Sequence, residues 1–320
     1  MSESVRLFDP ERLARVFEEL AGAAPERPGD PRLQHLQQIV TVADGSLFRA
    51  LPRMVWAVWL GDTDRAVKAH VQFEVLKGVP ARLAVTPGQG AEIAALGARL
   101  EAGRLYVLDR GYRSFDLLQA IGDAGSSFVL RLGENAVYEG LEEKAITPEA
   151  AAARVSFDAV VRLGGPQSGR KLDRPVRLVR LSVPASAPRG LGYPLKRVHS
   201  KKTFRRPPGE AHEMLIVTDR LDLPADVIAR LYQYRWQVEL FFRLLKCVFG
   251  CRHLLSDSYN GVSIQLYAAL IATLLLAEYT GQRPTKRSYE LVALYLQGWV
   301  SDDELRAHLA RLPDGAAKPH

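Results

Sequence analysis

A stripe of polar side chains on an otherwise apolar segment is the strongest chemical signal in the chain. The pattern over residues 225–246 predicts one long helix that carries Tyr232, Arg235, Glu239 and Lys246. At about 100° per residue, these four side chains fall within an arc of roughly 60°. Large apolar residues cover the other faces, and a helix that is apolar over most of its circumference is buried. The stripe must therefore face a cleft or polar partners.

Helix geometry alone leaves two interpretations of this stripe open. Arg235 and Glu239 are four residues apart, which is the spacing of an ordinary ion pair on a solvated helix face. The other interpretation is a functional surface in which the carboxylate and the basic groups act together. The residue types do not decide between them, so the rest of the chain must.

A second polar feature is a basic run with His199 and Phe204 interleaved. It fits a solvated loop and a DNA-contacting loop equally well. Its basic residues are Lys196, Arg197, Lys201, Lys202, Arg205 and Arg206.

The segments before the polar stripe predict an α/β core. In order they are a strand, a hairpin, a helix, a strand, a helix and a strand. Their ranges are 36–43, 71–76 with 82–86, 92–100, 105–108, 115–121 and 127–131. This order is typical of a mixed sheet with helical crossovers.

The residue pattern of the chain changes after residue 132. Short β-like runs separated by Gly, Pro and basic residues predict a β-rich insertion over residues 133–213. A strand resumes at 214–218, directly before the long helix. The apolar stretch from Val262 to Tyr279 is just long enough to span a bilayer, but a buried core helix is the favoured interpretation because nothing else in the sequence suggests a membrane protein.

Bulk composition constrains the class of protein without naming it. The 320 residues suffice for one large core with an inserted subdomain. With 43 Lys and Arg against 36 Asp and Glu, the formal net charge is +7, which suits a polyanionic partner. The two cysteines, Cys247 and Cys251, imply no disulfide framework and fit a reducing cytosol.

The spacing of the stripe, Tyr-x2-Arg-x3-Glu-x6-Lys, resembles the signature of transposases of insertion-sequence family 4 at every fixed position. Four other motifs agree with that family, and the resemblance extends from about residue 37 to 280. They are Asp44-Gly45-Ser46, Lys68-Ala69-His70, Asp109-Arg110-Gly111-Tyr112 and Phe128-Val129-Leu130-Arg131.

The resemblance implies an RNase H-like fold: a mixed five-stranded α/β sheet flanked by helices, with a β-rich insertion before the last catalytic helix. It also implies a catalytic triad of Asp44, Asp109 and Glu239 that binds Mg²⁺, with Mn²⁺ as the alternative. Carboxylate oxygens are the ligands that such hard cations prefer. Asp109 and Glu239 are 130 positions apart, which leaves room for the insertion. Asp44 precedes Gly45, and Asp-Gly is also a common turn.

The resemblance further implies metal-dependent DNA cleavage at transposon ends and strand transfer into target DNA. The expected partner is double-stranded DNA, bound by a homodimer on paired ends, with no membrane. The expected location is the cytoplasm of a prokaryote, at the nucleoid when bound. The residues expected to contact DNA are Tyr232, Arg235, Lys246, Arg131, Lys201, Lys202, Arg205 and Arg206.

The expected organisation has five parts. These are an N-terminal helical remnant (1–35), the first part of the catalytic core (36–132), the insertion (133–213), the second part of the core (214–285) and a helical tail (286–320). Only 43 residues precede Asp44, fewer than is usual in the family, so the alternative expectation is a truncated or co-opted DNA-binding derivative. A different RNase H-like nuclease is a third hypothesis, disfavoured by the stripe spacing and the insertion.

Overall fold

The computed structural model describes most of the chain and divides it into two compact units. The described residues are 9–26, 30–33, 35–59, 64–164, 172–183, 212–247, 250–251, 253–281 and 286–311. The first unit consists of Met1–Leu36, Ala43–Leu96 and Gln237–His320, and the second of Gln37–Val42 and Gly97–Trp236. Neither unit is a single stretch of sequence, so each is assembled by long-range packing.

Three parallel strands form the centre of the second unit. The first residues of β1 (Ile39–Arg49) pair in parallel with β4 (Arg104–Leu108), and β4 pairs in parallel with β5 (Ser127–Leu132). All of β4 is buried, which explains why its apolar run is continuous rather than alternating. The connection between β4 and β5 contains η2 (Arg110–Tyr112) and α4 (Phe115–Asp123).

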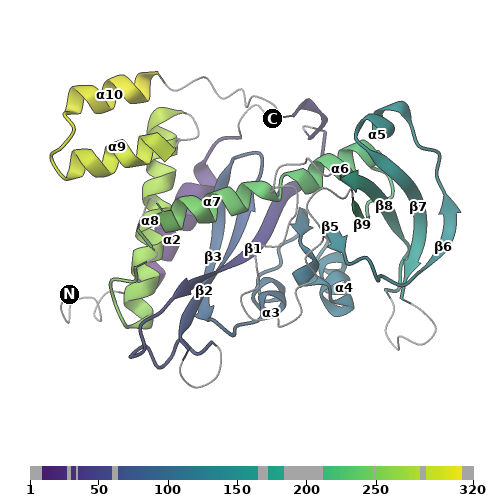
Figure 1. Ribbon diagram of the computed structural model, residues 1–320, viewed down its shortest axis with the longest axis horizontal. Coiled ribbons are helices and arrows are strands. Elements are labelled where there is room, and N and C mark those ends of the chain that lie inside the picture. Colours follow the sequence, from purple (N-terminus) through teal and green to yellow (C-terminus); the bar gives the residue numbers. More distant parts are fainter. Residues whose placement is uncertain are drawn as a thin grey trace. The chain divides into compact units, whose positions relative to one another are not determined.

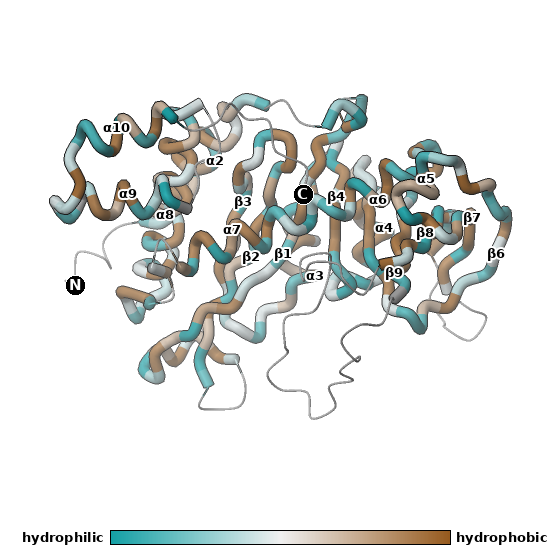
Figure 2. The backbone as a smooth tube through the Cα atoms, turned by 45° about the horizontal axis from the view of Figure 1, so that its top comes forward, coloured by the Kyte–Doolittle hydropathy of each residue, from teal (hydrophilic) through white to brown (hydrophobic). Residues whose placement is uncertain are grey.

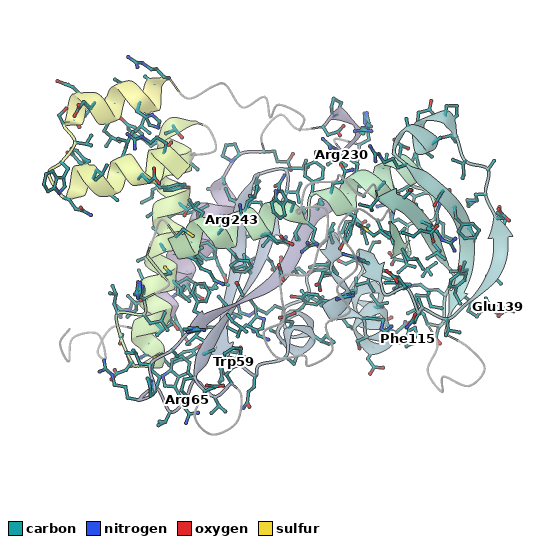
Figure 3. All side chains as sticks on the ribbon, in the orientation of Figure 1. Trp59, Arg65, Phe115, Glu139, Arg230 and Arg243 are labelled. Atoms are coloured by element: carbon teal, nitrogen blue, oxygen red, sulfur yellow. The ribbon has the colours of Figure 1, made fainter. Side chains whose placement is uncertain are left out.

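The insertion continues this sheet. Its strands β6 (Tyr138–Glu143), β7 (Val155–Leu163) and β8 (Val176–Val183) pair antiparallel in sequence. Strand β9 (His212–Thr218) pairs antiparallel with both β8 and β5 and so joins the insertion to the core. The outermost strand, β6, is largely exposed and acidic, and its Glu139 is labelled in Figure 3. Charged residues on an edge strand discourage pairing with other chains.

The strand order among the described residues is β3-β2-β1-β4-β5-β9-β8-β7-β6. Its first five strands are the mixed RNase H-like sheet expected from the sequence, and the α/β fold class is confirmed. The insertion was expected as a β-rich segment. It extends the same sheet to nine strands because β9 bonds to the edge that β5 would otherwise leave open.

A β-hairpin and the N- and C-terminal helices make up much of the first unit (Figure 1). Strands β2 (Ala66–Glu74) and β3 (Val79–Pro87) pair antiparallel, and α3 (Glu92–Gly97) follows. The other elements, in chain order, are α2 (Pro10–Ala23), η1 (Pro31–Leu33), α7 (Trp236–Cys247), α8 (Tyr259–Thr280), α9 (Lys286–Leu296) and α10 (Asp302–Ala310). In α9 and α10, hydrophilic and hydrophobic residues alternate along the helix, as Figure 2 shows.

Helix α8 is the apolar segment noted in the sequence. It is long and apolar enough to cross a membrane by composition, and 56% of its most apolar window is buried within the protein. It packs against α2 and β3. Tyr267 of α8 lies 5.9 Å from the ring of Phe17 in α2 and donates to Leu83 O of β3 at 3.3 Å. These contacts are those of a core helix.

The long helix expected over residues 225–246 is interrupted. It divides into α6 (Ala225–Gln233) and α7 (Trp236–Cys247). At the junction, Tyr234 N donates to Leu231 O and Arg235 N to Tyr232 O, each at 3.1 Å, so the backbone bonds are three residues apart. Such a turn is wound more tightly than an α-helix, so the single 60° stripe expected from uniform helical geometry is not maintained.

Candidate active site

Asp44 lies within strand β1 and belongs to the first unit. The strand was expected to end at residue 43, but it runs to Arg49, so Asp44-Gly45-Ser46 is extended strand rather than a turn. Gly45 N donates to Asp44 Oδ1 at 2.8 Å. The side chain of Asp44 is half-buried, which leaves it accessible at the surface of the unit.

Asp109 directly follows strand β4 in the second unit, as the sequence predicted. Its Oδ1 accepts a hydrogen bond from Gly111 N at 2.7 Å and caps the short helix η2. In the parallel pair of β1 and β4, Val42 is the partner of Val107. Asp44 and Asp109 each come two residues after one member of that pair.

A cluster of charged groups in the second unit surrounds Tyr232. Tyr232 is buried in α6, and the guanidinium of Arg235 lies 5.9 Å from the centre of its ring. Burial raises the pKa of the Tyr232 hydroxyl, the positive charges of Arg235 and Arg131 lower it, and the negative charge of Asp109 raises it. The fold therefore brings Tyr232 and Arg235 into electrostatic contact with Asp109 and Arg131, which lie much earlier in the sequence.

Glu239 and Lys246 occupy α7 in the first unit. Glu239 is in the first turn of the helix and is half-buried. Lys246 Nζ donates to Ser46 Oγ at 2.7 Å and lies 4.9 Å from the centre of the Phe48 ring. Because Ser46 is two residues after Asp44, the last residue of the stripe is anchored to the strand that carries the first aspartate.

Two arginines of these helices are labelled in Figure 3: Arg230 of α6, which is half-buried, and Arg243 of α7, which is exposed. Arg131, on β5, is half-buried beside Tyr232. The remaining expected DNA contacts lie in the basic run and fall outside the described residues: Lys201, Lys202, Arg205 and Arg206.

The Lys-x-His motif of β2 has structural partners. Lys68 Nζ donates to Gly90 O at 2.9 Å and pairs with Glu92 Oε1 at 3.4 Å. His70 is buried and its Nε2 lies 2.9 Å from Thr86 Oγ1 on the neighbouring strand. Both residues thus tie β2 to the end of β3 and to the loop that follows.

The three expected metal ligands fit a hard divalent cation by type, since all are carboxylates. Across the part of the chain that the structure describes, no three His, Cys, Asp or Glu side chains gather closely enough to hold a metal ion. Two of the three carboxylates accept a backbone N–H from their own loop or strand, Asp44 from Gly45 and Asp109 from Gly111.

Comparison with known families identifies one match that covers most of the chain. The model of the transposase DDE domain matches residues 35–275. That range includes Asp44, Asp109, Glu239 and the whole stripe from Tyr232 to Lys246.

Individual relatives are also transposases by name. The putative transposase y4zB of Sinorhizobium fredii is 30% identical over 215 residues, which cover 66% of this chain and 53% of that protein. The probable transposase for insertion sequence element IS5377 of Geobacillus stearothermophilus is 28% identical over 226 residues, 70% of this chain and 52% of that protein. The putative transposase for insertion sequence element IS4SA of Synechocystis is 33% identical over 81 residues, 24% of this chain and 22% of that protein. The chain thus spans about half the length of the first two.

Among solved structures, the piggyBac transposase in a synaptic complex with hairpin DNA is similar at a TM-score of 0.40 and 11% identity. The match covers 88% of this chain and 59% of that one.

Proposed function

Because the chain belongs to the transposase DDE domain family, we propose that it cleaves DNA at the ends of a mobile element and transfers the freed strands into target DNA. The observation that carries this proposal is the family match over residues 35–275, which contains every residue of the expected triad. The family match does not favour the alternative expectation, a derivative that only binds DNA.

The proposed catalytic residues are Asp44, Asp109 and Glu239. The first two are supported by the family match and by their place in the chain, because each comes two residues after one member of the Val42–Val107 pair. Glu239 is supported by the anchoring of its helix, since Lys246 of α7 bonds to Ser46 of β1. The three carboxylates are the proposed metal ligands.

The proposed chemistry has two steps at phosphorus. Water attacks the phosphodiester at the element's end and releases a 3′-hydroxyl, which then attacks a target phosphodiester and releases the neighbouring 3′-oxygen. Mg²⁺, or Mn²⁺ in its place, would help to activate the nucleophile and stabilise the leaving oxygen when bound. The protein's own part is to hold the carboxylates and the DNA strand in register.

We assign strand positioning to Tyr232, Arg235, Lys246 and Arg131, together with the basic run. Arginine pairs with phosphate through two N–H groups, which fixes orientation as well as charge. Tyr232 and Arg235 are buried, and the charges of Arg131 and Asp109 act on the Tyr232 hydroxyl. The residues proposed for the basic run are Lys201, Lys202, Arg205 and Arg206.

The finer points of organisation belong to the same proposal. We propose double-stranded DNA as the partner, a homodimer on paired ends, and action in the cytoplasm at the nucleoid. The division into an N-terminal segment, a core interrupted by the insertion, and a helical tail is proposed with the boundaries given above.

The deciding experiment is Mg²⁺- or Mn²⁺-dependent nicking of DNA that carries the ends flanking this protein's own gene. Wild type and Asp109→Ala are compared, with binding to the same DNA measured in parallel. We expect nicking by wild type alone. Equal nicking by the two proteins would show that the activity does not depend on Asp109, whereas binding without nicking by wild type would support a derivative that only binds DNA.

A further inference from the structure

Glu92, which no sequence motif singled out, lies against the strand that carries Asp44. A Cβ added to Gly45 would stand 3.0 Å from Glu92 Cγ and 3.0 Å from Glu92 Oε1. The N–H of Gly45 donates to Asp44 Oδ1. Glu92 therefore packs on the residue whose backbone holds the Asp44 carboxylate.

Lys68 holds Glu92 in this position. Its ammonium lies 3.4 Å from Glu92 Oε1 and donates to Gly90 O at 2.9 Å. The side chains of Lys68 and Glu92 are only 15% and 27% exposed, so the pair is more shielded than a surface ion pair. One ammonium thus links strand β2 both to the loop after β3 and to the first residue of α3.

The loop between β3 and α3 is itself fixed. Gly88 N donates to Ala66 O at 2.8 Å and Gln89 N donates to Val58 O at 3.1 Å. Trp59, labelled in Figure 3, packs so closely on Gly88 that an added Cβ would stand 3.0 Å from its side chain. Glu92 therefore directly follows a loop whose backbone is held by hydrogen bonds. All of these residues belong to the first unit.

We propose that Glu92, held by Lys68, is a positioning residue for Asp44. The inference rests on the proposed function, because it takes Asp44 to be a metal ligand. The packing of Glu92 on Gly45 restricts the Asp44–Gly45 peptide, and the like charge of its carboxylate disfavours rotation of Asp44 toward α3. Asp44 is thereby directed away from Glu92, with fewer orientations to lose when a cation binds. Groups that orient a metal ligand in this way commonly change metal affinity when they are removed.

The test is a titration of the full chain with Mn²⁺ in the absence of DNA. The electron paramagnetic resonance signal of free Mn²⁺ measures how much of the ion is bound. Glu92→Gln and Lys68→Met remove the charges and nearly preserve side-chain shape. We expect each to weaken Mn²⁺ binding by about 10-fold. The matched control is Lys77→Met, which breaks the 3.3 Å pair of Lys77 with Glu74 at the other end of the same hairpin. Binding as tight as wild type in Glu92→Gln and Lys68→Met would overturn the proposal.

Asp44→Ala separates failure of this inference from failure of the proposed function. If Asp44→Ala binds Mn²⁺ as wild type does, the metal-ligand assignment itself is wrong. If Asp44→Ala loses binding while Glu92→Gln keeps it, the triad stands and only the role of Glu92 is rejected.

A coupling experiment excludes a general loss of stability. Gly45→Ala inserts a methyl group into the contact with Glu92, so we expect it to weaken Mn²⁺ binding in the wild-type background. In a Glu92→Ala background the methyl group has room, and we expect Gly45→Ala to have no further effect. Independent losses that multiply in the double variant would contradict the proposal.

Discussion

Glu239 is a proposed metal ligand, and its substitution tests cleavage separately from DNA binding. Glu239→Gln keeps the size of the side chain and its place in the first turn of α7 but removes the negative charge that a cation needs. We expect strand cleavage to fall on the order of 10³-fold or more, with DNA binding largely retained. Nicking and gel-shift assays on the same DNA check both expectations.

The control for this substitution is Glu278→Gln, an exposed glutamate on α8. It makes the same chemical change away from the stripe and should leave cleavage intact. If Glu239→Gln cuts as well as Glu278→Gln, Glu239 is not part of the triad.

Asp219 offers a pH-dependent test of the fold in the second unit. Burial raises its pKa above the ordinary value, although Phe128 N, which donates to it at 2.9 Å, and the charge of Arg174 lower it. A raised folded-state pKa means that the carboxyl contributes most stability below its unfolded pKa and loses that contribution as pH rises through the folded value. Relative to Asp219→Asn, we therefore expect wild type to lose stability as pH rises from below the ordinary pKa of an aspartate toward neutral.

Urea unfolding of the two proteins across that range checks the direction. A wild type that instead gains stability over Asp219→Asn as pH rises would mean that Arg174 and the backbone donor outweigh burial. The comparison uses the difference between two variants, so other titrating groups cancel to first order.

At the scale of elements, a buried ion pair ties the insertion to the loop before α6. Arg177 of β8 pairs with Asp158 of β7, its Nη2 at 2.6 Å from Asp158 Oδ2, and also donates to the carbonyls of Leu221 and Leu223. Asp158 is 2% exposed, so its removal leaves a buried guanidinium without its counter-charge. We expect Asp158→Ala to lower the free energy of unfolding by about 3–5 kcal/mol.

Urea denaturation measures this loss, with Glu139→Ala as the control. Glu139 lies on the same sheet and pairs with Arg162 at 3.5 Å, but both side chains are well exposed. A solvated pair of this kind contributes less than about 1 kcal/mol. Equal effects of the two substitutions would show that the Asp158–Arg177 pair does not stabilise the fold by virtue of its burial.

The elements that the sequence predicted best are the strands in which all or nearly all residues are buried. Strand β4 is buried throughout and reads as an unbroken apolar run, and β5 is nearly so. The end of β1 was misplaced because Asp44-Gly45-Ser46 has the composition of a turn, whereas strand pairing carries it to Arg49. The break after α6 contains no Gly or Pro, so nothing local marked it.

The candidate site was predictable only where a linear motif marks it. Asp44, Asp109 and Glu239 stand in recognisable contexts, whereas Glu92 depends on a contact with Gly45 that no spacing encodes. The Lys-x-His motif was visible, but its partners were not, because Glu92 is 24 positions beyond Lys68 in the sequence. Three-dimensional packing, rather than sequence pattern, supplies this part of the site.

At the scale of the whole molecule, the chain passes from one unit to the other at points that are near proposed site residues in the sequence. One passage is between Val42 and Ala43, directly before Asp44, and another is between Trp236 and Gln237, within the stripe. The two aspartates therefore belong to different units.

The net charge of +7 predicts that DNA binding weakens as salt rises, and the basic run tests where that charge acts. Replacing Lys201, Lys202, Arg205 and Arg206 by Gln removes four positive charges from one segment. If each contacts a phosphate, the slope of log binding constant against log salt should become shallower by about 3.6. Fluorescence anisotropy of labelled duplex over a salt series measures the slope.

The control replaces four exposed arginines elsewhere by Gln: Arg12, Arg15, Arg287 and Arg306. A slope change confined to the first set supports direct phosphate contacts, whereas equal changes in both sets would mean that only the overall field of the protein attracts DNA.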